Sequence, residues 1–151
     1  MKKILFVCHG NICRSPMAEF VMKDLLNKEG IEAYVASAAT STEEIGNPVH
    51  RGTRAKLGQY GISTDGKYAV QLTKTDYDKY DYLIGMDTYN IRNMLRILGG
   101  DPEGKVCKLL SFAGDDGDIA DPWYTGNFDD TYEDVVKGCR ALLSVLATAA
   151  I

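Results

Sequence analysis

Short strand-like runs alternate with amphipathic stretches along this chain. The first run, residues 3–7, is short, continuous and apolar, as a buried parallel strand is. Further strands are predicted at 31–38, 80–86 and 105–112. Helical patterns, of which 51–60 is the weakest, are predicted at 16–29, 51–60, 88–98 and 135–146. Because strand and helix alternate, we predict an α/β fold with a four-stranded, doubly wound parallel sheet and helices on both faces.

Local signals predict where two of these helices begin or end. Ser15 is a good N-cap and Pro16 suits the first helical position, while Gly30 is placed to end the same helix. Asp130 and Glu133 resemble a capping box ahead of the last helix. The first helix is therefore predicted to begin directly after the first strand and one short loop.

Length, composition and charge narrow the class of protein. The 151 residues fit one domain, residues 1–151, and their 45% hydrophobic and 25% charged content is that of a soluble globular protein. A formal net charge of −4 without a basic cluster argues against general nucleic-acid binding. No apolar run approaches a signal peptide or a membrane span. We therefore expect neither nucleic acid nor a membrane as a partner.

The cysteines indicate a reducing compartment. The four, at positions 8, 13, 107 and 139, match neither a secreted disulfide framework nor close-spaced metal ligands. Only two histidines, His9 and His50, are available as further metal ligands. We expect a cytoplasmic monomer with no metal and no other cofactor.

Residues 7–16, VCHGNICRSP, carry the most chemical information in the chain. They place Cys8 at the end of the first strand, Gly10 and Asn11 in a short loop, and then the start of a helix. Backbone N–H groups of such a loop and the helix N-terminus form a site for an anion such as phosphate. The same field favours Cys8 as the nucleophilic thiolate. Arg14 is suited to bind two phosphate oxygens at once, as lysine is not.

The spacing C-x5-R of Cys8 and Arg14 is weak evidence by itself, because a single cysteine is most often a buried structural residue. The functional interpretation rests on agreement among the preceding strand, the Gly-Asn loop and the helix start. Ser15 has two interpretations at this stage, as a hydrogen-bond donor to the thiolate or as a simple helix cap.

The same segment resembles a known family. It matches the signature C-x-G-N-x-C-R-S-P of the low-molecular-weight protein tyrosine phosphatases. The matching positions are Cys8, Gly10, Asn11, Cys13, Arg14, Ser15 and Pro16. Segments that resemble the family in the same order are 37–40, 45–48, 86–87 and 121–122. The resemblance extends over nearly the full length and implies the doubly wound fold predicted above.

The resemblance implies a two-step reaction with Cys8, Arg14 and Asp121 as catalytic residues. Cys8 takes the phosphoryl group, while Asp121 protonates the leaving phenolic oxygen and then activates the water that hydrolyses the phosphocysteine. From the sequence alone Asp121 is an ordinary loop aspartate, and only the following Pro and aromatic residues distinguish it. Trp123 and Tyr124 are expected to form walls for an aryl phosphate, although packing onto the core is an equal alternative for one of them.

The loop supplies the other expected binding residues, largely through backbone N–H groups. They are His9, Gly10, Asn11, Ile12, Cys13 and Ser15. Asn11 is expected to hold the loop by hydrogen bonds, including one to Ser37. Cys13 has two interpretations, a reversible disulfide partner for the nucleophile, as in the family, or a small residue that fills the loop. Asp87 resembles a structural family position and is otherwise a helix cap.

Two positions depart from the family pattern. Glu43 stands where many members carry an aromatic residue at the mouth of the site. A carboxylate there weakens aromatic stacking and favours basic residues beside the phosphotyrosine. A histidine that often supports the phosphate loop has no equivalent in residues 66–70.

Three related functions compete with phosphotyrosine hydrolysis. A thiol-linked arsenate reductase shares the fold but needs relay cysteines, and residues 80–98 contain none. A protein-arginine phosphatase of the same family carries a threonine that corresponds to Ile12. A phosphocysteine carrier of sugar phosphotransferases would not need Arg14 together with Asp121. We predict a protein tyrosine phosphatase that acts on a tyrosine-phosphorylated protein or peptide and releases inorganic phosphate, with the arginine phosphatase as the main alternative and the arsenate reductase as the weaker one.

Overall fold

Four parallel strands form the centre of the computed structural model, which describes residues 1–149. The strands are β1 (Lys2–Cys8), β2 (Ala33–Ala39), β3 (Tyr82–Gly85) and β4 (Val106–Lys108). Their order across the sheet is β2-β1-β3-β4, so β1 and β3 are central. The register pairs Cys8 with Ala39 and Phe6 with Ile84. The predicted four-stranded parallel sheet is confirmed.

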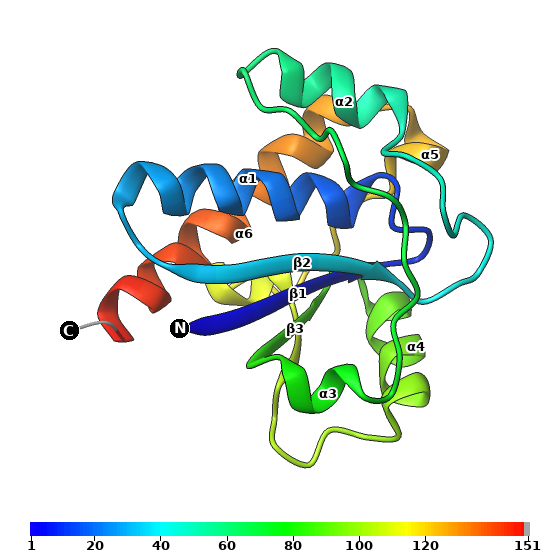
Figure 1. Cartoon of the computed structure of the whole chain (residues 1–151), viewed down its shortest axis with the longest axis vertical. Helices are drawn as coiled ribbons and strands as arrows, with labels where there is room; N and C mark the ends of the chain where they lie inside the picture. Colours follow the sequence, from blue (N-terminus) through cyan, green and yellow to red (C-terminus); the bar gives the residue numbers. More distant parts are fainter. Residues whose placement is uncertain (150–151) are drawn as a thin grey trace.

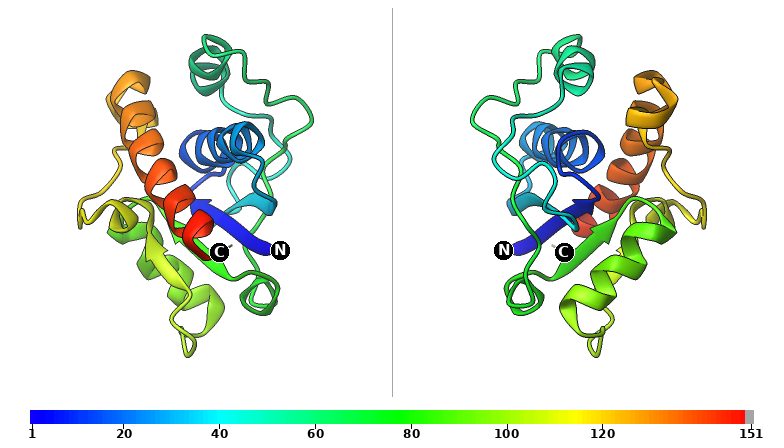
Figure 2. Two further views of the ribbon diagram at one scale, coloured as in Figure 1. Left: turned by 90° about the vertical axis from the view of Figure 1, so that its left-hand side faces the viewer. Right: turned by 90° about the vertical axis from the view of Figure 1, so that its right-hand side faces the viewer.

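Helices cover both faces of this sheet, as predicted (Figures 1 and 2). The α-helices are α1 (Arg14–Glu29), α2 (Arg51–Gly58), α3 (Asp76–Lys79), α4 (Thr88–Leu98), α5 (Pro122–Thr125) and α6 (Phe128–Ala149). α1 and α6 lie on one face, with α2 packed against both of them, and α3 and α4 lie on the other. None of the helices in residues 1–149 is long and apolar enough to cross a membrane.

Alternating residues of β1 enter two separate cores. Ile4 and Phe6 pack in the cluster formed with α1 and α6. Leu5 and Val7 pack in the cluster formed with α4. Each fully buried side chain of this size contributes about 1.5–3 kcal/mol by leaving water. Burial on both faces therefore fixes β1, and with it the position of Cys8 at its carboxyl end.

The predicted strand at 105–112 is wrong in its second half. β4 ends at Lys108, and Leu109–Ala113 form a 3₁₀-helix, η1. A Cβ atom built on Gly138 of α6 would lie 2.5 Å from the side chain of Leu109, so the two segments approach closely. Leu109 and Leu110 are buried in the cluster that contains α6. The apolar side chains of this run are therefore buried by a turn onto α6 and not by an extended strand.

Both predicted helix-start signals are also wrong. α1 begins at Arg14, so Ser15 lies inside the helix, where its hydroxyl faces the loop and not the helix end. α6 begins at Phe128, ahead of the expected Asp130–Glu133 box. There Asn127 Oδ1 accepts a hydrogen bond from the backbone N–H of Asp130 at 3.0 Å, and Asn127 Nδ2 donates to the Asp130 carboxylate at 2.8 Å. Asn127 is the residue that caps α6.

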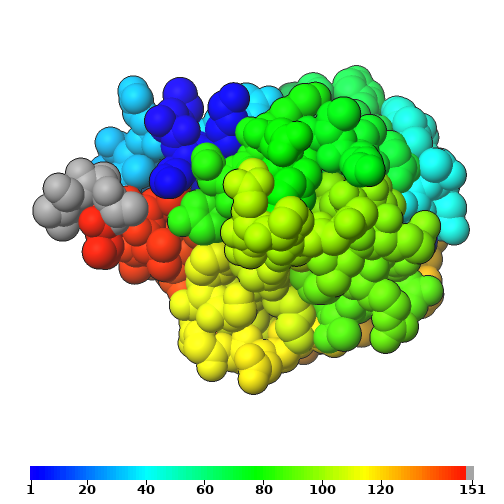
Figure 3. Space-filling view, turned by 90° about the horizontal axis from the view of Figure 1, so that it is seen from below, coloured from blue at the N-terminus to red at the C-terminus, as the bar shows by residue number. Residues whose placement is uncertain are grey.

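The face that carries α3 and α4 is broad. Seen from below, α3, α4 and the segment between α4 and β4 cover most of this face, and the segment after β4 protrudes beside them (Figure 3). That protruding segment is the beginning of a loop that returns to the carboxyl ends of the strands. It therefore links the α4 face of the sheet to the end of the sheet where Cys8 lies.

Candidate active site

Cys8 ends β1 at the point where the strand order reverses. β1 pairs with β2 on one side and with β3 on the other. In open parallel sheets, ligands bind outside the carboxyl ends of the strands at such a switch point. The side chain of Cys8 is buried, and its carbonyl accepts a hydrogen bond from the backbone N–H of Thr40 at 3.0 Å. Residues 8–14, called the phosphate loop below, connect the end of β1 with the first residue of α1.

The sulfur of Cys8 faces hydrogen-bond donors of the α1 N-terminus. The hydroxyl of Ser15 lies 3.0 Å from Sγ, and the backbone N–H of Ser15 donates to Sγ at 3.4 Å. Burial first, and then the charges of Cys8 and Asp121, raise the pKa of Cys13 to about 12. Of the two loop cysteines, Cys8 is the one placed for reaction as a thiolate.

Asn11 holds the phosphate loop in an unusual conformation. Its backbone φ of 57° lies in the left-handed region, which residues other than glycine rarely adopt. Its Nδ2 donates to Ser15 Oγ at 2.8 Å and to Ser37 Oγ at 2.9 Å, and its Oδ1 accepts from the backbone N–H of Val70 at 3.1 Å. The predicted contact with Ser37 is confirmed. Three hydrogen bonds on a side chain that is 1% exposed offset the local strain.

The buried carboxylate of Glu19, which no sequence signal marked, sets the direction of the hydrogen bonds that run through Ser37, Asn11 and Ser15. Glu19 of α1 accepts from Ser37 Oγ at 2.6 Å. Because Ser37 donates to Glu19, it is an acceptor for Asn11, and both hydrogens of the Asn11 amide are then used. Because Ser15 Oγ accepts from Asn11, the single hydrogen of its hydroxyl is free to point at Cys8. Glu19 therefore favours the arrangement that stabilises a thiolate.

Two lysines neutralise this carboxylate. Lys23 Nζ donates to Glu19 Oε2 at 2.6 Å. Lys67 Nζ lies 3.8 Å from Glu19 Oε1 and donates to the carbonyl of Ser37 at 2.8 Å. Burial lowers the pKa of Lys67 in spite of the nearby carboxylate. Lys67 thus contacts the two residues, Ser37 and Glu19, that continue the hydrogen-bond chain from Asn11, and it lies in the segment that lacks the family histidine.

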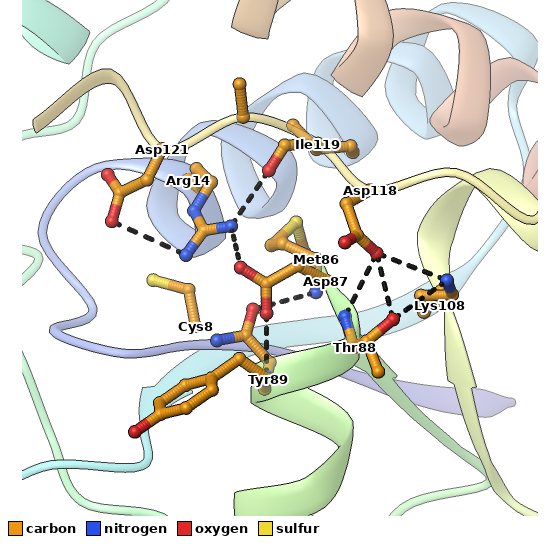
Figure 4. Close-up of polar contacts among 12 residues, drawn as sticks. Cys8, Arg14, Met86, Asp87, Thr88, Tyr89, Lys108, Asp118, Ile119 and Asp121 are labelled. Carbon is orange, nitrogen blue, oxygen red and sulfur yellow. Dashed lines mark hydrogen bonds and ion pairs between the residues drawn. The ribbon is translucent and has the colours of Figure 1, made fainter. Parts of the chain in front are cut away.

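Arg14 connects the phosphate loop to two other loops. Its side chain is 3% exposed, and its Nη1 donates to Asp87 Oδ2 at 2.7 Å and to the carbonyl of Ile119 at 2.9 Å (Figure 4). Its Nη2 lies 3.5 Å from Asp121 Oδ2. Burial lowers its pKa, but the charges of Cys8, Asp87 and Asp121 outweigh this effect and raise it above the ordinary value. Arg14 is therefore a fixed cation beside the Cys8 sulfur.

Asp121 lies at the end of the loop opposite Cys8. Its Oδ1 accepts from the backbone N–H of Trp123 at 3.0 Å and caps the short helix α5. Its Oδ2 faces Arg14, and its side chain is 22% exposed (Figure 4). One carboxylate oxygen is therefore used to hold the loop, while the other faces the cavity above Cys8.

A cavity of about 90 Å³ joins these groups. The residues that line it include Cys8, Arg14, Asp121, Trp123 and Tyr124. Trp123 and Tyr124 are 56% and 82% exposed, so neither packs into the core. Trp123 meets the ring of His50 edge-on, with centroids 5.6 Å apart.

The lining of the cavity also includes two glutamates. Glu43 and Glu44 border the cavity, and Glu43 Oε2 lies 3.1 Å from Nε2 of His9. Both side chains are open to solvent, at 69% for Glu43 and 40% for His9. Glu43, which the sequence predicts to stand where many family members carry an aromatic residue, thus borders the cavity and pairs with His9.

A family model describes almost the whole chain. The model of the low molecular weight phosphotyrosine protein phosphatases matches residues 3–150. The chain belongs to this family.

Comparisons with individual members of this phosphatase family agree with the family match. The chain is 42% identical over 148 residues to the low molecular weight protein-tyrosine-phosphatase YfkJ of Bacillus subtilis, with 95% of each chain covered. It superposes on the crystal structure of YfkJ with a TM-score of 0.95, covering 99% of this chain and 96% of that one. A low molecular weight protein tyrosine phosphatase from Streptococcus pyogenes is 44% identical, with a TM-score of 0.86 and coverage of 95% and 92%.

The structure brings most of the predicted site residues of this family member to one cavity. Those that border it are Cys8, His9, Gly10, Ile12, Cys13, Arg14, Asp121, Trp123 and Tyr124. Asn11 and Ser15 are buried behind it and hold the loop. Among residues 1–149, no group of three or more His, Cys, Asp or Glu side chains is arranged to hold a metal ion. Glu19 and Lys67 carried no sequence signal beyond their places on a helix and in a loop.

Proposed function

We propose that this protein tyrosine phosphatase hydrolyses phosphotyrosine in proteins or peptides through a phosphocysteine on Cys8. The observation that carries the proposal is the joint position of three groups on one cavity. Cys8 with its donors, the fixed cation Arg14 and the carboxyl group of Asp121 all border it. A nucleophile, a group that binds phosphate and an acid are what a phosphoryl transfer of this type requires.

In the first step the Cys8 thiolate attacks phosphorus and the bond from phosphorus to the phenolic oxygen breaks. Asp121, protonated, gives its proton to that oxygen, so the product leaves as a neutral phenol. Backbone N–H groups of the phosphate loop and the guanidinium of Arg14 bind the phosphoryl oxygens. The contact from Arg14 Nη2 to Asp121 is long, at 3.5 Å, so this nitrogen is the one we assign to phosphate.

In the second step water attacks the phosphocysteine. Asp121, now ionised, takes a proton from the water, the bond from sulfur to phosphorus breaks, and inorganic phosphate leaves. The hydrogen of the Ser15 hydroxyl, directed at Sγ, stabilises the thiolate as it departs. The same donor thus serves Cys8 as nucleophile and as leaving group.

Ile12 and the free cysteines support the finer points of the proposal. Ile12 borders the cavity, and its bulk favours a tyrosine ester over a compact phosphoguanidinium group. The alternative substrate is phosphoarginine, because a Drosophila arginine phosphatase is 31% identical and has a TM-score of 0.85.

All four cysteines are free, which fits a reducing compartment such as the cytoplasm.

The test compares peptides of one sequence that carry phosphotyrosine, phosphoarginine or phosphoserine. Release of inorganic phosphate is expected from the phosphotyrosine peptide at a far higher kcat/KM than from the other two. Cys8→Ser should abolish turnover and still bind the phosphotyrosine peptide. A preference for phosphoarginine would overturn the argument from Ile12, and turnover by Cys8→Ser would overturn the assignment of the nucleophile.

A further inference from the structure

The loop that carries Asp121 is attached to the start of α4 by Asp118. Asp118 Oδ1 accepts hydrogen bonds from the backbone N–H of Thr88 at 3.0 Å, from the Thr88 hydroxyl at 3.2 Å and from Lys108 Nζ at 3.1 Å (Figure 4). Thr88 is the first residue of α4, and its N–H has no partner within the helix. One carboxylate oxygen therefore joins the loop, a helix end and a strand.

Lys108 holds the same loop at a second point. It ends β4, and its side chain is 20% exposed, so the sheet limits its movement. Its Nζ also donates to the Thr88 hydroxyl at 3.3 Å and to the carbonyl of Asp116. Burial alone would raise the pKa of Asp118, but the hydrogen bonds from Lys108 and Thr88 outweigh it and lower that pKa. The contacts thus favour the charged form of Asp118.

The start of α4 also holds Arg14. Asp87 caps the helix by accepting from the backbone N–H of Asn90 at 2.7 Å. The other oxygen of Asp87 accepts from Arg14 at 2.7 Å. Asp87 and Asp118 therefore attach the phosphate-binding arginine and the acid-bearing loop to the same helix end. The relative position of Arg14 and Asp121 depends on this shared support.

Further hydrogen bonds fix the backbone between Asp118 and Asp121. The N–H of Ile119 donates to the carbonyl of Met86 at 2.9 Å, and the Thr131 hydroxyl donates to the carbonyl of Ala120 at 2.9 Å. These contacts hold the segment in the absence of Asp118, but they do not reach α4. Loss of Asp118 is therefore expected to displace the loop slightly and not to unfold it.

From these contacts we propose that Asp118, held by Thr88 and Lys108, is a positioning residue for the acid Asp121. The inference rests on the proposed function, because Asp118 acts only through the acid role of Asp121. It predicts a specific defect. Proton transfer to the leaving oxygen requires close geometry, whereas attack by Cys8 uses no side chain of this loop. The loop contacts Arg14 through the carbonyl of Ile119, but Arg14 is held by Asp87 as well. Variants of Asp118 should therefore impair the hydrolysis of aryl phosphates in proportion to how poor the leaving group is.

The chain supplies a matched control in the same loop. Asp115 also pairs with a lysine at 3.1 Å, but that lysine is Lys137 of α6. Asp115 accepts from the backbone N–H of Gly117 at 2.7 Å and has no contact with α4 in the hydrogen bonds of residues 1–149. Asp115→Ala and Asp118→Ala thus each remove one aspartate–lysine pair of the loop, and only the second removes the link to α4.

The experiment measures kcat/KM for aryl phosphates whose phenols range from acidic to weakly acidic. Asp118→Ala is expected to lower kcat/KM about tenfold for the poorest leaving group and less than about twofold for the best. Asp115→Ala should follow the wild type across the series. Lys108→Met should show the same pattern as Asp118→Ala in weaker form, because Thr88 still holds Asp118. The loss in the double variant should be smaller than the product of the two single losses, because both variants remove the contact between Lys108 and Asp118.

Equal behaviour of Asp118→Ala and Asp115→Ala would overturn the proposal, as would a loss that is the same for every leaving group. Asp118→Asn keeps the side-chain shape and an acceptor oxygen, and it replaces Asp118→Ala if that variant does not fold. Asp121→Ala tests the acid role of Asp121 separately from the positioning role of Asp118. If its loss does not depend on the leaving group, the acid role itself fails. If its loss does and that of Asp118→Ala does not, only the positioning role fails.

Discussion

The phosphate loop and the rim of the cavity differ in how firmly their side chains are held. Asn11 and Arg14 are buried, and each makes at least three hydrogen bonds. Glu43 at the rim is 69% exposed, and within residues 1–149 its carboxylate forms a hydrogen bond with His9 alone, while Tyr124 is 82% exposed. The groups to which we assign the chemistry are thus held by several contacts before substrate arrives, whereas the groups proposed to meet the rest of the substrate are exposed and make few contacts. We expect changes in the loop to affect turnover and changes at the rim to affect substrate choice.

Among the variants proposed in this Discussion, Arg14→Lys is expected to lower kcat the most. Lysine keeps the charge but loses the two-pronged geometry and the simultaneous contacts with Asp87 and Ile119. We expect kcat to fall by about 10²–10³-fold, as for loss of a fixed donor to a developing negative charge. Steady-state kinetics with a phosphotyrosine peptide measures it, and thermal unfolding checks that the variant is folded. A loss below tenfold would show that the guanidinium geometry is not required.

A smaller effect is expected when the direction of the hydrogen-bond chain is disturbed. In Glu19→Gln the new amide is able to donate to Ser37, so the Ser15 hydroxyl is no longer forced to point at Cys8. We expect kcat and the rate of Cys8 alkylation by iodoacetate at mildly acidic pH each to fall about tenfold. Glu29→Gln at the exposed end of α1 is the matched control. An unchanged alkylation rate would contradict the role assigned to Glu19.

At the rim, Glu43→Gln should change specificity and leave small substrates unaffected. The carboxylate is exposed, so its attraction for a cation of the substrate is screened and worth roughly 1 kcal/mol or less. We expect KM to rise about two- to fivefold for a phosphotyrosine peptide with a neighbouring arginine, with no change for phenyl phosphate. The preference should weaken further in high salt. An equal change for both substrates would place Glu43 in the chemistry of the reaction.

The smallest effect is expected in the pH dependence of stability. Hydrogen bonds lower the pKa of Asp118 below its ordinary value of 3.8, so the charged form stabilises the fold above that value. This contribution is lost as the pH falls through the lowered pKa. Wild type and Asp118→Ala should therefore differ in Tm at pH 7, by less than about 3 °C, and the difference should shrink as the pH falls below 3.8. A difference that stays constant through this acid range would mean that the charge of Asp118 is not its source.

The sequence predicted the elements whose signal is local. Parallel strands and long amphipathic helices were found because apolar residues mark their buried faces, and α4 has its predicted bounds, Thr88–Leu98. The short helices α3 and α5 were missed, because four residues are too few to show a helical period. The second half of the 105–112 run was assigned wrongly, because its burial depends on contact with α6.

The same distinction holds in the active site. The phosphate loop was predicted because seven signature residues lie within residues 8–16. Glu19, Lys67 and Asp118 act across the fold, on partners 18, 30 and 30 positions away in the chain. A charged residue on a helix or loop is usually solvated, so nothing in the sequence distinguishes these three. Their roles emerge only when the fold brings their partners together.

The central claim is that the sulfur of Cys8 carries the phosphoryl group during turnover. Rapid acid quenching of the wild-type protein during hydrolysis of a phosphotyrosine peptide, followed by peptide mapping with mass spectrometry, tests it directly. The account predicts a transient phosphoryl group on the peptide that contains Cys8, at the thiol of that residue, and none in Cys8→Ser. A phosphoryl group on another residue, or full turnover with no phosphorylated protein at any quench time, would contradict it.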